Sequence, residues 1–184
     1  MKVNHKSNFC IFLCDVLYFY KIFHERNQST MELEYFSPAG MEEAVRQIVD
    51  KIDKKERGSF NAMLAPRLTA VSWEDKCCTL LYRTAEWMSN PIGIAHGGVL
   101  CAIADLSMGV LSKYYAKDVT ITPTVSINLN YLRPVPLEGE VLAVSSIDHA
   151  GRRLNQLHCT IYNAAEPDKP CVTATGTYFV ETAK

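Results

Sequence analysis

The sequence has no run of basic residues and no interleaving of basic with aromatic residues, which argues against a nucleic-acid-binding protein. It also has no C-x-x-C pair and no Cys/His cluster at metal-ligand spacing, which argues against a zinc site. Internal repeats and low-complexity segments are absent as well. With 184 residues, 48% of them hydrophobic, and a formal net charge of −1, the chain is expected to build one domain with a substantial core.

The cysteines show no pattern of paired bridges. They are odd in number, scattered, and mostly embedded in apolar segments. This pattern indicates reduced thiols packed as small hydrophobic side chains in a reducing compartment, so the sequence predicts a cytoplasmic protein. The seven residues are Cys10, Cys14, Cys77, Cys78, Cys101, Cys159 and Cys171.

Residues 1–30 form an atypical N-terminal extension. Their apolar run, Phe9–Phe23, is too short to span a bilayer and is interrupted by Asp15 and Lys21, so no membrane partner is expected. Three interpretations stay open: a signal peptide without a small-x-small cleavage site, a helix at a surface or membrane, or a natural start at Met31 with a non-native segment upstream. We favour the third, which the nucleotide sequence of the gene would test.

Residues 31–59 carry the pattern of an amphipathic helix. Ser37 is suited to cap the helix and Pro38 to its first turn. Apolar residues then recur at helical spacing from Met41 to Ile52, and Lys54–Gly58 closes the element. The segment is expected to pack on a domain formed by residues 60–184.

The stretch after Asn90 organises that domain. His96-Gly97-Gly98 opens a run with helical periodicity that continues to about Tyr115. One face is large and apolar, whereas the other is small with a single carboxylate, Asp105. Glycine inside a helix costs about 1 kcal/mol relative to alanine, so Gly98 and Gly109 predict close approach by a ligand or a second helix. The large face comprises Val99, Leu100, Ile103, Leu106, Ser107, Val110, Leu111 and Tyr114; the small face comprises Gly98, Cys101, Ala102, Asp105, Gly109, Ser112 and Ala116.

The remainder reads as strands separated by turns. Alternating or β-branched segments bounded by turn residues predict an antiparallel meander. One long two-faced helix with five or so such strands indicates an α+β fold in which a sheet wraps around the helix. The expected strands are 68–73, 78–83, 119–131, 140–149, 154–163 and 171–180.

Several motifs resemble those of hotdog-fold acyl-CoA thioesterases, in the branch that contains the phenylacetyl-CoA thioesterases. They are Asn90, His96-Gly97-Gly98, Ala104-Asp105, Val125–Pro134 and the Gly151-Arg152 turn, and the resemblance covers about Phe60 to Val180. His-Gly-Gly alone is a weak signal; an Ala-Asp at the matching place on the helix makes it more specific. The resemblance implies a hotdog fold, acyl-CoA hydrolysis, and a dimer in which Asp105 is supplied across the interface.

Thioester hydrolysis needs a water nucleophile, a base, and donors for the developing oxyanion. Asp105 is the only ionisable side chain on the small face, and it can serve as general base or attack the carbonyl itself to form a mixed anhydride. The sequence leaves both routes open. Unpaired N–H groups and the positive end of the dipole lie at the helix start, so the backbone N–H of Gly97 is the candidate to polarise the thioester carbonyl.

Three further residues are candidates for the site. His96 is either a positioning residue or only a helix cap. Asn90 is either a turn residue before Pro91 or, as the resemblance implies, a residue that positions water or the thioester. Thr124 lies near the place of a Ser or Thr that hydrogen-bonds water in the family, although it is also ordinary as a strand residue.

The remaining expectations concern ligands and assembly. Arg133, Arg152 and Arg153 are candidates for the phosphates of CoA, although exposed turn arginines are common. No cofactor is expected apart from the CoA moiety of the substrate, and a homodimer or homotetramer is expected. The alternative function is a non-catalytic acyl-CoA-binding sensor. A hotdog dehydratase is disfavoured because no Glu lies between His96 and Tyr115.

Overall fold

The computed structural model describes residues 34–55, 58–119 and 121–180, so the predictions for residues 1–30 lie outside the described part of the chain. The chain divides into two units, residues 1–40 and Met41–Lys184. The boundary falls inside α2 (Pro38–Lys55). The rest of α2 and all the later helices and strands belong to the second unit.

Helix α2 begins as predicted. The Ser37 hydroxyl accepts a hydrogen bond from the backbone N–H of Gly40 at 3.1 Å, which satisfies one of the unpaired donors of the first turn. Its apolar positions are buried in the second unit: Met41, Ala44, Val45, Val49 and Ile52.

A short helix, α3 (Phe60–Leu64), follows and was not predicted. Ser59 caps it by accepting from the N–H of Ala62, and it ends at Ala65, which has a left-handed φ of 46°. Five residues are too few to show a helical period in the sequence. Alanine rarely adopts the left-handed conformation, so Ala65 gave no signal that a helix ends there.

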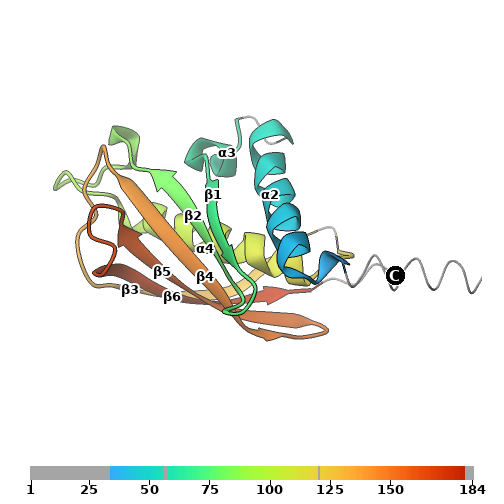
Figure 1. Cartoon of the computed structure of the whole chain (residues 1–184). Helices are drawn as coiled ribbons and strands as arrows, with labels where there is room; N and C mark the ends of the chain where they lie inside the picture. The colour runs from blue at the N-terminus through green and yellow to red at the C-terminus, as the bar shows by residue number, and fades with distance from the viewer. Residues whose placement is uncertain (1–33, 56–57, 120, 181–184) are drawn as a thin grey trace, which may run out of the picture. The chain divides into compact units, whose positions relative to one another are not determined.

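A single sheet of six antiparallel strands forms the frame of the second unit (Figure 1). The strand order is β1-β2-β4-β5-β6-β3. The predicted meander is therefore correct for β4, β5 and β6, whereas β3 lies beyond β6 rather than between β2 and β4. Alternation along β3 shows that it is a strand but cannot show its neighbours. The bounds are β1 Arg67–Ser72, β2 Cys77–Arg83, β3 Thr124–Tyr131, β4 Glu140–Ala150, β5 Leu154–Asn163 and β6 Pro170–Phe179.

Helix α4 (Gly97–Tyr115) runs across the concave side of this sheet and contacts β2 through β6 (Figure 1). Its span and the wrapping of the sheet around it match the sequence prediction. Two buried polar pairs fix it to the strands: the hydroxyls of Tyr82 and Ser107 lie 2.7 Å apart, and the Asn155 amide donates to Ser112 Oγ at 3.1 Å. Satisfied buried polar pairs of this kind set the rotation and register of a helix on its sheet.

The predicted faces of α4 need a correction. Ser112 and Ala116, assigned to the small face, are buried, and Ala104 and Met108 join them against the sheet. Val99 and Leu106, assigned to the large face, are only half-buried. The buried face is thus rotated toward Ala104, and Asn155 holds Ser112 inside by a hydrogen bond. Asp105 lies at the boundary of this face and is half-buried.

The described cysteines, Cys77, Cys78, Cys101, Cys159 and Cys171, are all free thiols, and three of them are buried. Among the described residues, no helix is long and apolar enough to cross a membrane.

Candidate active site

The loop in front of α4 is held by the Asn90 side chain. Its Oδ1 accepts hydrogen bonds from the backbone N–H groups of Ile92 and Ile94, at 3.1 and 3.2 Å. Because Oδ1 is occupied in this way, Nδ2 is the free end of the amide, and no acceptor for it is found among the described residues. Two backbone hydrogen bonds also anchor the loop. The N–H of Ala95 donates to the Val135 carbonyl at 2.9 Å, and the N–H of His96 donates to the Met88 carbonyl at 2.7 Å. The helix start is therefore a preorganised element.

His96 is the N-cap of α4. Its Nδ1 accepts from the N–H of Gly98 at 2.9 Å, so Nδ1 carries no proton and the ring can donate only from Nε2. A Cβ at position 98 would lie 3.1 Å from Nδ1, so glycine there makes room for the ring. The capping role considered for His96 is thus a feature of the structure, and it leaves the exposed Nε2 available for positioning.

Gly97 is in contact with Tyr131, a residue that was not among the predicted site residues. The Tyr131 hydroxyl donates to the Gly97 carbonyl at 2.8 Å, and a Cβ on Gly97 would come within 3.2 Å of the Tyr131 ring. Within the described residues, no acceptor is found for the Gly97 backbone N–H. Gly97 therefore combines close packing against Tyr131 with an unpaired donor at the positive end of the helix. The tyrosine within Val125–Pro134 was the available signal.

A cavity of about 380 Å³ opens at this helix end. Asn90, Gly97 and Arg133 line it, together with apolar groups that include Leu100 and Val135. The cavity thus combines a free backbone donor, a free amide and a guanidinium with apolar walls, as is typical of small-molecule sites.

Asp105 is held by donors from two paired strands, β3 and β6. Thr124 Oγ1 donates to Asp105 Oδ1 at 2.7 Å, and the Tyr178 hydroxyl donates to the same oxygen at 2.9 Å. Burial, and then the charge of Asp105, raise the pKa of Tyr178 far above its usual value, so Tyr178 remains a donor. Both bonds fall on Oδ1, and no donor to Oδ2 is found in the described part of the chain. Tyr178 had no signal in the sequence, since it occupies an ordinary inward position of β6.

Asp105 does not lie at the cavity of Gly97. It is absent from the lining of that cavity and is eight residues further along α4, about 12 Å along the helix axis. One protomer therefore has two separate groups of candidate residues. Asp105 lies with Thr124, whereas Gly97 lies with Asn90 and Arg133 at the cavity.

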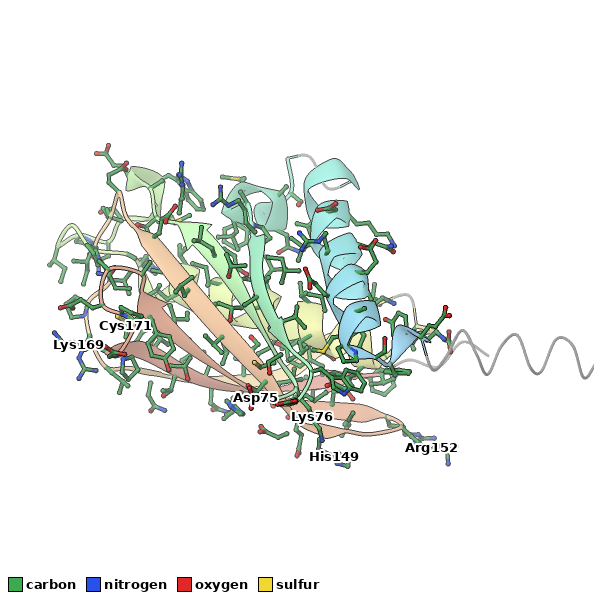
Figure 2. All side chains as sticks on the ribbon, viewed as in Figure 1. Asp75, Lys76, His149, Arg152, Lys169 and Cys171 are labelled. Carbon is green, nitrogen blue, oxygen red and sulfur yellow. The ribbon has the colours of Figure 1, made fainter. Side chains whose placement is uncertain are left out.

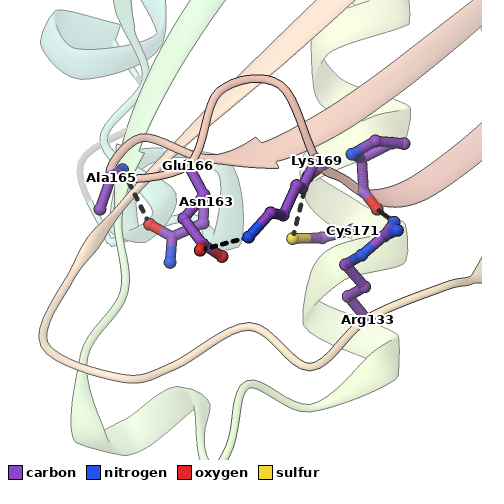
Figure 3. A network of polar contacts seen from close by, with 7 residues as sticks. Arg133, Asn163, Ala165, Glu166, Lys169 and Cys171 are labelled. Atoms are coloured by element: carbon purple, nitrogen blue, oxygen red, sulfur yellow. Dashed lines mark hydrogen bonds and ion pairs between the residues drawn. The ribbon is translucent and has the colours of Figure 1, made fainter.

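The three candidate arginines are also separated. Arg133 Nη1 donates to the Pro170 carbonyl at 2.6 Å, beside the loop that joins β5 and β6 (Figure 3). In that loop Lys169 Nζ lies 2.8 Å from Glu166 Oε1. The hydrogen bond and the charge of Lys169 lower the pKa of the Glu166 carboxyl. Arg152, at the β4–β5 turn, lies at the far end of the sheet from Lys169 and Cys171 (Figure 2).

β4 spans 11 residues, about 35 Å, between these two ends. Arg152 and Arg153 of one protomer therefore cannot meet the same phosphate as its Arg133. Among the described residues, no group of three or more His, Cys, Asp or Glu side chains is placed to hold a metal ion.

Comparisons with known proteins agree with this architecture. The family model described as the Thioesterase superfamily matches residues 92–168, a range that contains His96, Asp105, Thr124 and Arg133. Thioesterase superfamily member 2 from zebra fish is similar with a TM-score of 0.64 and 17% identity, over 74% of this chain and 96% of that one.

Two further solved structures are similar. A putative thioesterase from Ralstonia eutropha, named as a phenylacetic acid degradation-related protein, has a TM-score of 0.61 and 22% identity, over 72% of this chain and 99% of that one. A Streptococcus mutans protein bound to acetyl CoA has a TM-score of 0.54 and 24% identity, over 64% and 91%. At these identities the structures show the fold. The chain thus has the hotdog fold, and its resemblance to the hotdog thioesterases is confirmed.

Proposed function

We propose that this chain, a hotdog-fold protein whose central residues 92–168 match the thioesterase superfamily, hydrolyses acyl-CoA thioesters to a free acid and CoA. The family match supports thioester hydrolysis as the class of reaction. The observation that carries the proposal is the Asp105 carboxylate, with one oxygen fixed by Thr124 and Tyr178 and the other open. A carboxylate oriented in this way suits proton removal from water or direct attack on a carbonyl.

In the water route, Asp105 removes a proton as water adds to the thioester carbon. The carbonyl oxygen then becomes an oxyanion, which the N–H of Gly97 stabilises at the positive end of α4. The amide Nδ2 of Asn90 supplies a second donor, either to this oxygen or to the water. Collapse of the tetrahedral intermediate breaks the carbon–sulfur bond, and the CoA thiolate takes up a proton. In the alternative route, Oδ2 of Asp105 attacks the carbon and expels the CoA thiolate, which takes up a proton, and water then hydrolyses the mixed anhydride to the free acid and the Asp105 carboxylate.

Either route needs Asp105 and Gly97 at one thioester, which a single protomer does not provide. The proposal therefore includes a homodimer in which the partner's Asp105 faces the Gly97 cavity. Strand β3 supports this arrangement because it is an edge strand whose side chains are mostly exposed, including Val125 at 59% and Tyr131 at 55%. Thr124 lies on β3 beside Asp105, so pairing along this edge would bring the two groups of residues close. Unpaired edges with exposed apolar side chains favour association.

CoA is the proposed carrier of the acyl group, and the reaction uses no further cofactor. The acetyl CoA bound to the structurally similar Streptococcus mutans protein supports this choice. Arg133 is the best-placed arginine for a phosphate because it lines the Gly97 cavity. Arg152 and Arg153 would reach the same CoA only from the other protomer.

The test is thiol release by the purified protein from a panel of short, medium, long and aromatic acyl-CoAs. The proposal predicts turnover of at least one class, and loss of that turnover in the variant Asp105→Asn. If the protein binds acyl-CoAs but releases no thiol from any of them, the result would favour the alternative function, a non-catalytic acyl-CoA sensor.

A further inference from the structure

A second cavity, of about 280 Å³, lies between α2, α4 and the segment that leads into β3. Its apolar walls come from Ile48 and Ile52 on α2 and from Leu106 and Val110 on α4. Nothing in the proposed chemistry uses this cavity.

Residues that line the cavity lie close in the chain to Asp105 and to its donor Thr124. Leu106 is the following residue on α4, and Gly109, which also lines the cavity, is one helical turn further on. Thr122 lines the cavity from the other side and precedes Thr124, the donor to Asp105, by two residues. An acyl chain whose thioester carbon is at Asp105 can therefore extend along α4 into this cavity.

Two lysines, one from each helix, line the same cavity: Lys51 and Lys113. Burial, and then the charge of Lys51, lower the pKa of the Lys113 ammonium, and the smaller effect of the Asp118 charge opposes this only in part. No carboxylate of the described residues pairs with either lysine. Two ammonium groups that share a partly apolar cavity repel each other, so an anion between them would be stabilising.

We propose that this cavity holds the acyl group of the substrate and that Lys51 and Lys113 bind a second carboxylate at its far end. The inference rests on the proposed acyl-CoA hydrolysis and names its substrate class: medium-length dicarboxylic acids attached to CoA through one end. Lys113 follows Asp105 by eight residues, about 12 Å along the helix axis, which sets the separation between the thioester and the second carboxylate. The apolar walls between them suit the methylene groups of such a chain.

The test compares suberyl-CoA with octanoyl-CoA, which have the same number of acyl carbons and differ in the terminal carboxylate. Suberyl-CoA should have the higher kcat/KM, by at least about tenfold, as expected for a hydrogen-bonded ion pair. In Lys113→Met and Lys51→Met that ratio should fall by a similar factor. The same changes should raise kcat/KM for octanoyl-CoA, because an apolar side chain replaces an ammonium in the cavity wall. The matched control Lys76→Met, in the β1–β2 turn (Figure 2), should keep the wild-type ratio.

Equal kcat/KM for the two substrates in the wild type would overturn the inference while leaving acyl-CoA hydrolysis in place. A uniform rise of KM for all acyl-CoAs in the lysine variants would also overturn it, because the lysines would then serve the CoA phosphates. If no acyl-CoA is hydrolysed, the proposed function fails, and the inference is decided by calorimetric binding of two thioethers of CoA. Tighter binding of the carboxyheptyl thioether than of the octyl thioether, lost in Lys113→Met, would support it; equal binding would overturn it.

Discussion

Tyr178 donates its hydroxyl hydrogen bond to Asp105 at two atoms, the side-chain Oδ1 and the main-chain carbonyl oxygen, each at 2.9 Å. A residue of the last strand thereby fixes both the rotamer of the carboxylate and the position of the helix turn that carries it. Thr124 adds a third bond from the neighbouring edge strand β3. Asp105 thus owes its orientation to β3 and β6, two strands that are distant in sequence and paired in the sheet.

Replacing Tyr178 by phenylalanine should slow turnover without removing it. The variant loses one hydrogen bond to a charged group, worth about 1.5–3 kcal/mol, so we expect kcat to fall about tenfold or more. KM should change little, because the Tyr178 hydroxyl is already bonded to Asp105. Steady-state kinetics check this, with Thr124→Val as the matched loss of the other donor. A wild-type kcat in both variants would show that the orientation of Asp105 is unimportant.

The cap at the helix start gives a second prediction. His96→Ala removes the acceptor for the N–H of Gly98 and should lower the free energy of unfolding by about 1 kcal/mol. Activity should fall less than in Asp105→Asn, since the proposed mechanism assigns proton removal to Asp105 and only positioning to His96. Urea unfolding and kcat, measured on the same sample, separate the two effects. A loss of activity larger than that of Asp105→Asn would make His96 the base.

Position 109 allows a steric test of the acyl cavity. Apart from the backbone of α4 itself and the two chain neighbours, the ring of Tyr178 is the one group of the described residues within 4 Å of a Cβ placed on Gly109, at 3.7 Å, so a Cβ fits there in ordinary van der Waals contact. Gly109→Leu should fill part of the cavity and shift the preference toward shorter acyl groups, while helix propensity makes the variant at least as stable. A panel of straight-chain acyl-CoAs checks this. An unchanged chain-length profile would place the acyl group elsewhere.

Stability should decrease in alkaline solution because of a buried thiol. Burial raises the pKa of Cys159 from 9.0 to about 12. The folded protein keeps the thiol neutral, whereas the unfolded chain ionises above pH 9, so the contribution is complete below that pH and declines as pH rises toward the folded value. Urea unfolding between about pH 8 and 10.5 should show this decline, with a shallower slope in Cys159→Ala. Identical slopes would assign the decline to other groups.

The sequence predicted much of the fold because the relevant signals were local. Helical periodicity from Gly97 to Tyr115 identified α4, and alternation with turn residues identified most strands to within a residue or two. The place of β3 beyond β6 was missed, since pairing depends on contacts between segments far apart in the chain. The rotation of α4 was missed for a similar reason: Ser112 is held inside by a hydrogen bond from Asn155, and a serine alone does not reveal its partner.

The candidate residues were accessible from the sequence to different degrees. Motif spacing singled out Asn90, Gly97 and Asp105. Tyr178 and the lysines of the second cavity were not singled out, because an inward tyrosine on a strand and lysines on helices are ordinary. Only the fold shows that Tyr178 points to Asp105, and that Lys51 and Lys113 face one cavity.

The central claim is that Asp105 of one protomer acts on a thioester held by the other, and complementation of two variants tests it most directly. Asp105→Asn lacks the base or nucleophile, and turnover should fall by at least about 10²-fold. Asn90→Asp keeps the acceptor for Ile92 and Ile94 but loses the Nδ2 donor, so it should also be weakly active.

Unfolded together and refolded at equal amounts, the two variants should recover about a quarter of wild-type activity, because half of the dimers are mixed and each mixed dimer has one intact site. Activity no higher than the mean of the two separate variants, or near wild-type turnover by Asp105→Asn alone, would contradict the account.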